Sequence, residues 1–504
     1  MRVDKEKRPV TPISGKRRAA LDGTAMLIYL CLVYLWALWL YPLGRDYAFL
    51  AEQGANMPFL AGRLFAWEVG AFGSSPVGYH LVNLAFLYAC MLCVYRFVRL
   101  SVKGPFWLGT LAATLFMANP IHSESILNLA GVADLVPALL ALLALTAYAE
   151  LAAKPRLWRW ALALIYFALA VLPYRQNAAL VLVVVLYEWL VVDKAARRWW
   201  RVVPFAVIAF DAWAGMPSLW AWPSYNLTRM FAPLYFVFYP LGFLPETART
   251  FHVHPWLGYL AVLVILAVVG LVYRKARRPV ILFGLLGMVA VRFGQGFDFV
   301  DPVHLIGGGR LLVANALFNV ALVALFFRMM DHPKWRQPVV VWTTVLCVVF
   351  FALELRCVAA WHRAGDFAER FQEQAAGAAG EQVGIVPDYQ YYRGAPMCLS
   401  ESVAYDTPFS KAVPAVPLLQ LNCMNLQSTH VMLDSWTAAT GTVVLQAPNV
   451  LDLAPYPYTL VRPNATQRTD GALVTTRERG QNQLTLLIRS RNGALPRLLL
   501  PAGK

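Results

Sequence analysis

Long apolar segments recur along this sequence, and they constrain its fold more than any other feature. A helix needs about 17–20 apolar residues to cross a bilayer core, and such windows follow one another over most of the first 356 residues. Backbone polar groups in lipid must be satisfied within the segment, so each window predicts an α-helix. We expect eleven transmembrane helices, at 24–42, 80–100, 105–118, 134–152, 157–172, 178–192, 202–216, 256–273, 279–294, 310–328 and 338–356. A twelfth apolar run, 230–244, contains Pro233 and Pro240 and is interpreted as an interfacial or re-entrant segment.

The predicted fold class is a polytopic all-α membrane protein with a C-terminal soluble α/β domain. Hydrophobic residues make up 59% of the chain and charged residues only 14%, which is typical of polytopic membrane proteins rather than soluble ones. We expect a transmembrane domain over 1–356 and a soluble domain over 357–504. Alternating apolar segments such as "TGTVVLQAP" and "QLTLLIRS", separated by turn residues, predict strands in the latter.

The basic residues indicate the orientation of the chain. The net charge of +16 alone would suit a nucleic-acid binder, but 24 Lys/Arg fall in the N-terminal tail and five later clusters, and only seven fall in the intervening connections. This alternation follows the positive-inside rule, so we expect a cytoplasmic N-terminus, no nucleic-acid partner and a periplasmic C-terminal domain in a bacterial inner membrane. The same clusters are also compatible with contacts to anionic lipid headgroups. The first apolar segment lacks a small-residue cleavage site and is expected to stay as an anchor.

Two of the seven cysteines, Cys398 and Cys423, fall in the expected periplasmic domain. A disulfide between them suits an oxidising compartment. Two buried thiols are the alternative.

Ionisable residues gather at the expected outer ends of the spans, where such residues commonly mark function. A cavity that combines them would suit an anionic, amphiphilic ligand with its phosphate at the interface and its tail in lipid. The residues are Arg45, Asp46, Glu52, Arg63, Glu68, His80, His122, Glu124, Asp134, Arg175, Arg292, Asp298, Asp301, His304 and Arg310.

Glycosyl transfer from a lipid phosphate requires a small set of groups that these residues supply. A carboxylate must accept the proton of the attacking hydroxyl, and cationic donors must stabilise the departing phosphate. "GGGR" at 307–310 is not followed by Lys-Ser/Thr, so it is interpreted as a turn that leads into a span rather than as a nucleotide-binding loop.

Three motifs resemble the GT-C glycosyltransferases, polytopic enzymes that use polyprenyl-phosphate sugars. "GRDYAFL" (44–50) resembles their acidic motif. "NPIHSESILNLAGVADLV" (119–136) resembles the "HPxHxEAV…GRADLL" signature of the transmembrane O-mannosyltransferases with tetratricopeptide repeats and of their bacterial relatives, but has Val132 where that family has Arg. "GGGRLLVANALF" (307–318) retains the family's Arg as Arg310, whereas "YRQN" (174–177) replaces its Lys-Glu pair.

The resemblance implies an inverting glycosyltransferase in which Asp46 is the catalytic base. Transfer would run from a polyprenyl-phosphate sugar to an exported protein or glycan at the periplasmic face, within the bilayer. We expect no required cofactor, although a divalent cation that bridges Asp46 and phosphate is an alternative. Expected contacts to the donor phosphate are Arg175, Arg310, His122 and Arg45, and expected substrate contacts are Glu124, Asp134, His304 and Arg63.

Non-catalytic interpretations of these residues and of the chain remain open at this stage. Asp46 could be an acid paired with Arg45 in solvent, and Asp134 could stabilise a helix N-terminus. Glu354 and Arg356 are expected to satisfy each other or the headgroups. For the whole chain, the alternatives are a transporter or flippase of lipid-linked glycans, an O-antigen-ligase type enzyme, and a non-catalytic envelope-assembly scaffold.

Overall fold

The computed structural model describes residues 15–214, 279–295 and 308–376, and shorter stretches of the C-terminal part. Those stretches are 384–392, 395–397, 407–409, 418–425, 432–437, 442–446, 453–461, 473–479, 483–489 and 497–498. The expected span 256–273, the apolar run 230–244, His304 and Cys398 lie outside the described residues.

The described part is dominated by apolar helices. The long elements are α1 (Gly15–Tyr34), α4 (Pro76–Val102), α5 (Trp107–Met117), α7 (Val132–Ala153), α8 (Leu157–Val171), α9 (Leu180–Leu190), α10 (Val203–Ala214), α15 (Pro279–Gln295), α16 (Leu312–Met330) and α17 (Pro333–Ala376). Among the described residues, five helical segments are long and apolar enough to cross a membrane: Ala19–Trp39, Pro76–Val102, Leu129–Ala153, Gly309–Met330 and Pro333–Glu373. Four shorter apolar helices accompany them, at Trp107–Met117, Leu157–Val171, Asn177–Leu190 and Pro279–Val291. The chain is therefore a predominantly helical, polytopic membrane protein.

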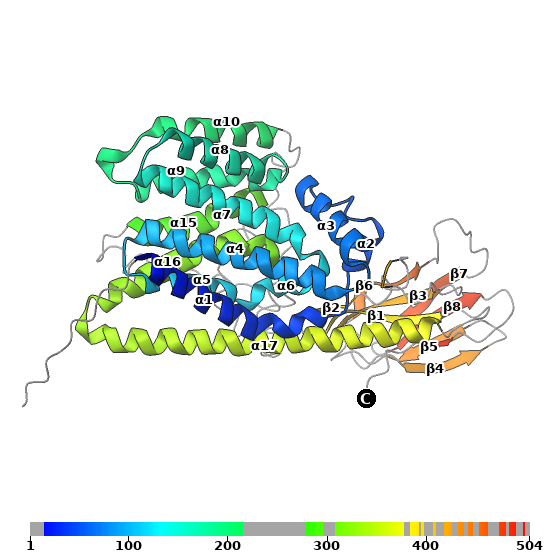
Figure 1. The fold of residues 1–504 in the computed structure, drawn as a ribbon. Helices are drawn as coiled ribbons and strands as arrows, with labels where there is room; N and C mark the ends of the chain where they lie inside the picture. The colour runs from blue at the N-terminus through cyan, green and yellow to red at the C-terminus, as the bar shows by residue number, and fades with distance from the viewer. Residues whose placement is uncertain are drawn as a thin grey trace, which may run out of the picture.

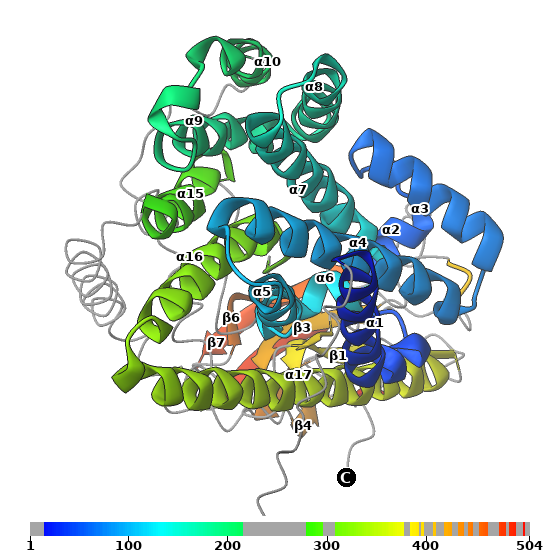
Figure 2. The same cartoon turned by 60° about the vertical axis from the view of Figure 1, so that its left-hand side comes forward.

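Most of the described helices pack around a large apolar core, and a smaller apolar cluster lies around α2 (Asp46–Ala51), α3 (Phe59–Phe72) and the start of α4 and α7. Helix α7 contacts α8 and α4, and α15 contacts α16 and α9. Helix α17 contacts α1, α5 and α16. Figure 2 shows it running below these three helices, with α8 and α10 on the far side of the bundle. Close packing needs small residues, as membrane helices generally do: a Cβ added to Gly284 would lie 2.7 Å from Ala321. Large apolar side chains stay exposed on the outside, as a lipid-facing surface requires. Examples are Trp36 on η1 (Leu35–Trp39), Phe210 on α10 and Trp342 on α17.

Short elements collect at one end of the bundle. They are α2 (Asp46–Ala51), α3 (Phe59–Phe72), η2 (Pro120–His122), α6 (Ser123–Leu127), η3 (Leu129–Gly131), η4 (Arg175–Ala179) and η9 (Gly308–Leu311). Figure 1 shows α2, α3 and α6 at the same end of the bundle as the β-strands. This end holds the polar residues singled out in the sequence.

The described residues after α17 include nine strands, which form two sheets. They are β1 (Gly384–Tyr392), β2 (Ala395–Pro396), β3 (Leu418–Asn425), β4 (Met432–Thr437), β5 (Thr442–Gln446), β6 (Leu453–Val461), β7 (Leu473–Arg479), β8 (Gln483–Arg489) and β9 (Arg497–Leu498). The first sheet has the order β2-β1-β3-β6, with β9 also on β1, and its β1–β3 pair is parallel. The second has the order β4-β5-β8-β7 and is antiparallel.

The helical and strand-containing parts are joined by one continuous helix. Helix α17 has 44 residues, so the boundary expected between 356 and 357 falls inside it. Contacts close to α2 tie the two parts together as well. The backbone N–H of Gly44 donates to the carbonyl of Met397 at 3.1 Å, and the Tyr41 hydroxyl lies 2.9 Å from the carbonyl of Phe409.

Candidate functional site

Asp46 begins helix α2 and is almost completely buried, with 2% of its surface exposed. Its carboxylate accepts three backbone hydrogen bonds. Oδ2 accepts from the N–H groups of Leu43 (3.2 Å) and Leu129 (3.1 Å), and Oδ1 accepts from that of Ala130 (3.0 Å). A carboxylate offers about four acceptor positions, so one stays available on Oδ1. Burial raises the pKa of Asp46 to about 6, because desolvation outweighs the three amide bonds, which lower it.

The turn that binds Asp46 is held from its other side by helix α4. Asn83 donates from Nδ2 to the carbonyl of Asn128 at 2.7 Å. Gly131 permits this approach, since a Cβ there would lie 2.7 Å from that same nitrogen. Asp46 and Asn83 therefore clamp the turn through its N–H and C=O groups respectively.

Downstream of this turn, Asp134 lies in the first turn of α7 and accepts a hydrogen bond from Ser125 Oγ at 2.9 Å. Gly309 packs directly on this pair: an added Cβ would overlap Ser125 Oγ and Asp134 Oδ2. Element η9, which contains Gly309, contacts η2, α6 and α7. Arg310, half-buried in η9, is thereby brought to the segment that carries Glu124 and Asp134.

His122 is fully buried beside a group of asparagines on α16. Its Nε2 lies 2.5 Å from Asn315 Nδ2, and its ring packs on Phe116 with centroids 5.6 Å apart. Asn319 Nδ2 donates to Asn315 Oδ1 at 2.9 Å, which fixes the amide. These contacts hold η2 against α16. They give His122 a positioning role in this structure, and a phosphate contact by His122 stays a prediction.

Glu68 on α3 is a buried acid outside the spans. It has 0% exposure, and neither of its carboxyl oxygens has a hydrogen-bond partner among the described residues. Burial raises the pKa of Glu68 to about 8, so the acid is neutral at pH 7. The rings of Phe65, Phe72 and Tyr79 pack together on the same α3–α4 contact, with Tyr79 lying 5.9 Å from Phe65 and 5.6 Å from Phe72 between centroids. This aromatic wall separates the end of the bundle from solvent.

The remaining predicted cations lie at the surface in this structure. Arg45 and Arg175 are exposed. Arg63 is also exposed and lies over the ring of Phe59, 5.6 Å from its centroid. The proposed pairing of Asp46 with Arg45 in solvent is wrong, because Asp46 is buried on backbone amides and Arg45 is exposed.

The proposed pair of Glu354 and Arg356 is also wrong. Residues two apart on a helix point to different faces. Glu354 is fully buried and accepts a hydrogen bond from the Tyr34 hydroxyl at 2.7 Å, whereas Arg356 is exposed.

Sequence reasoning missed the asparagines and Gly309. Asn83 and Asn315 interrupt apolar spans, and a polar residue at membrane depth is a signal that could have identified them. Gly309 had no such signal, since its contacts are with Ser125 and Asp134, which are far from it in the chain.

A metal-ligand set is not evident in the described part of the chain, where no group of three or more His, Cys, Asp or Glu side chains is placed to hold an ion. Asp46 also has three of its acceptor positions filled by amides. A divalent cation bridging Asp46 to phosphate therefore gains no support from these contacts.

Comparison with known proteins gives structural likeness only. No family model matches the sequence, and no curated protein matches it. Two crystal structures of ArnT from Cupriavidus metallidurans align with 96% of this chain and 100% of theirs, at 13% sequence identity. The TM-score is 0.41 for the form bound to undecaprenyl phosphate and 0.43 for the apo form. At this similarity neither structure assigns a role to a residue of this chain.

Proposed function

We propose that this protein is an integral-membrane glycosyltransferase that moves a sugar from a polyprenyl-phosphate donor to a hydroxyl of an exported acceptor. The acceptor is a protein or an envelope glycan, and transfer takes place at the periplasmic face of a bacterial inner membrane. The observation that carries this proposal is a buried carboxylate, Asp46, fixed by backbone amides at the end of a membrane bundle. The sequence resemblance described above points to the same residue.

In the proposed reaction Asp46 acts as the general base. The acceptor oxygen attacks the anomeric carbon, its proton passes to the free acceptor position on Asp46 Oδ1, and the bond between the anomeric carbon and the phosphate oxygen breaks. The bonding pair leaves with the lipid phosphate. A base works best when its pKa is close to the working pH, and the raised pKa of Asp46 meets this requirement. The acceptor must displace the groups that now cover Asp46, since the side chain is only 2% exposed.

The departing phosphate requires cations near the same turn. Arg310 is the best candidate, because Gly309 seats η9 directly on the Ser125–Asp134 pair, one turn beyond the peptide groups that bind Asp46. Arg175 is exposed at the start of η4, and we propose it as a second contact to the lipid phosphate. Glu124 and Asp134 are proposed to orient Arg310 and to contact the sugar.

The deciding experiment is turnover of radiolabelled polyprenyl-phosphate sugars by the purified full-length protein in nanodiscs, with and without chelator. Asp46→Asn is compared with Glu52→Gln, which changes an exposed acid on the C-terminal side of the same short helix. We expect Asp46→Asn to lower turnover by about 100-fold or more and Glu52→Gln to leave it unchanged.

Asp46→Asn also disturbs the clamp on the η3 turn, so thermal unfolding is measured in parallel. The pH dependence of kcat/KM separates the two roles: with Asp46 as base the rate rises as pH passes through about 6, where the carboxylate forms. A folded Asp46→Asn variant that transfers sugar at the wild-type rate would show that Asp46 is only a clamp and would overturn the proposed mechanism.

A further inference from the structure

A hollow of about 380 Å³ opens at the opposite end of the bundle from Asp46. It lies between the end of α7, the start of α8 and the η6 turn (Trp199–Arg201). Three arginines line it, Arg156, Arg198 and Arg201, together with Trp160 and Trp200; the other lining residues are apolar. Among the described residues no acid lines it, so every polar side chain that the structure places there is a hydrogen-bond donor.

Two of these donors are buried without a partner. Arg201 is only 4% exposed, and its Nη1 has no hydrogen-bond partner among the described residues. The indole Nε1 of Trp160 is likewise buried and unpaired in that part of the chain. A buried donor left without an acceptor costs about 1–3 kcal/mol, so two in one hollow indicate an acceptor that binds there.

The acids that flank the hollow in the chain are occupied elsewhere. Asp193 pairs with Lys103 at 3.3 Å and does not line the hollow. Glu188 accepts the Tyr148 hydroxyl at 2.8 Å and the backbone N–H of Arg198 at 2.5 Å. Glu150 pairs with Arg96 at 2.5 Å. Neither acid lines the hollow, so its positive charge is available to an external anion.

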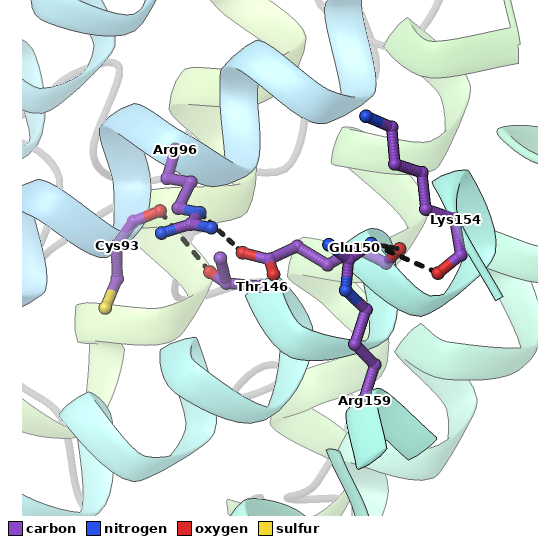
Figure 3. Close-up of polar contacts among 6 residues, drawn as sticks. All are labelled: Cys93, Arg96, Thr146, Glu150, Lys154 and Arg159. Atoms are coloured by element: carbon purple, nitrogen blue, oxygen red, sulfur yellow. Dashed lines mark hydrogen bonds and ion pairs between the residues drawn. The ribbon is translucent and has the colours of Figure 1, made fainter. Parts of the chain in front are cut away.

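The wall of the hollow is held in place by the capped end of α7, which Figure 3 shows. Arg159 donates from Nη1 to the carbonyls of Glu150 (3.3 Å) and Lys154 (3.1 Å). The Glu150 carbonyl also accepts the backbone N–H of Lys154 at 2.9 Å, and Lys154 is the C-cap residue that follows α7. The cap fixes the course of the chain just before Arg156, and a rigid wall lowers the entropy cost of binding.

The rim of the hollow is apolar and exposed. Leu157 is 81% exposed and Trp200 is 60% exposed, and Trp158 and Trp199 beside them are also exposed. Tryptophan is enriched where the membrane meets water. The rim therefore lies where acyl chains would reach and the arginines lie where a headgroup would be.

We propose that this hollow is a binding site for a phosphate group, and that its apolar rim selects a phosphate carried by a membrane lipid. The guanidinium groups bind the phosphate oxygens in charge-assisted hydrogen bonds, and the indole N–H of Trp160 supplies a further donor. This inference is independent of the proposed glycosyl transfer, because the hollow and Asp46 lie at opposite ends of the bundle.

The test measures dissociation constants for the delipidated full-length protein with three probes: short-chain phosphatidylglycerol, short-chain phosphatidylcholine and inorganic phosphate. The variants are Arg201→Gln and the exposed pair Arg156→Gln/Arg198→Gln, and the matched control is Lys194→Gln, an exposed cation of the same connection that does not line the hollow. We expect Arg201→Gln and the double variant each to weaken phosphatidylglycerol binding by about tenfold or more, with the control unchanged.

Each outcome decides one part of the proposal. If Lys194→Gln weakened phosphatidylglycerol binding as much as the arginine variants do, the effect would be due to general surface charge, and the proposed site would be refuted. Inorganic phosphate that binds as tightly as phosphatidylglycerol would keep the phosphate site and overturn the selection for lipid. The double variant guards against misfolding, because Arg156 and Arg198 are exposed: unchanged binding of phosphatidylglycerol by the folded double variant would refute the role of the arginines.

Discussion

Replacing Gly309 by alanine tests whether the close packing of η9 on Ser125 and Asp134 is needed for activity. The added methyl group would overlap Ser125 Oγ and Asp134 Oδ2, and each atom would have to retreat by about 1 Å because protein interiors are close-packed. The retreat breaks the 2.9 Å hydrogen bond between Ser125 and Asp134 or lifts η9 and Arg310 away.

The size of the effect follows from the contacts that are lost. A hydrogen bond to a charged group contributes about 1.5–3 kcal/mol to stability. Overpacking a close-packed site lowers stability by about 1–3 kcal/mol. If the geometry around Arg310 is needed to stabilise the leaving phosphate, this loss lowers kcat/KM by about 10- to 100-fold, since about 1.4 kcal/mol corresponds to a factor of ten.

The assay is sugar transfer by the full-length protein at saturating and limiting donor, together with thermal unfolding. Gly70→Ala is the matched control: it adds the same methyl group to a helix, with no atom within 4 Å to oppose it. We expect Gly70→Ala to keep full activity. A Gly309→Ala variant as active and as stable as Gly70→Ala would refute the packing of η9 on the Ser125–Asp134 pair.

Three further predictions concern stability. Burial raises the pKa of Glu68 from 4.5 to about 8, so the stability contributed by its neutral form is complete below pH 4.5 and has been lost once the pH passes 8. Glu68→Gln should therefore remove the fall in Tm that the wild type shows between about pH 5 and 8, and an unchanged pH profile would contradict this. Tyr34→Phe takes a 2.7 Å donor from the buried Glu354 and should lower unfolding free energy by about 1–3 kcal/mol, whereas a denaturation midpoint equal to wild type would argue against that bond. Arg96→Gln breaks an ion pair with Glu150 in which the Arg96 side chain is 63% exposed, so the change should stay below about 1 kcal/mol; a loss larger than that of Tyr34→Phe would be inconsistent with this exposure.

Hydropathy predicts the helices well because it reports a property of local sequence. The expected spans 80–100 and 310–328 fall within Pro76–Val102 and Gly309–Met330. Helix α10 covers residues Val203–Ala214 of the expected span 202–216, whose last two residues lie outside the described residues.

The expected boundary at 356/357 shows where hydropathy stops being informative. The apolar window ends there, but α17 continues because Trp361, Ala364, Ala368 and Phe371 place a buried stripe at helical spacing on its next turns. A search for helical periodicity across the boundary would have detected it.

The site itself was only partly accessible to sequence reasoning. An acid that follows a span marks Asp46 as notable, yet its burial depends on N–H groups of a turn more than 80 residues away. The sequence likewise contains no sign that Gly309 meets Ser125, because contacts of this kind depend on how whole helices pack.

The unbroken course of α17 also determines how the strand-containing part can move. At about 1.5 Å per residue, 44 residues extend for about 66 Å, roughly twice the thickness of a bilayer core. A helix of this length that is packed along the bundle tilts together with the bundle and does not bend. A macromolecule bound to the sheets would therefore stay at a constant distance from the membrane surface. Swivelling of the strand-containing part would have to break the contacts that tie it to the bundle, such as the hydrogen bond from Gly44 to Met397, and amide exchange at Gly44 would reveal such opening.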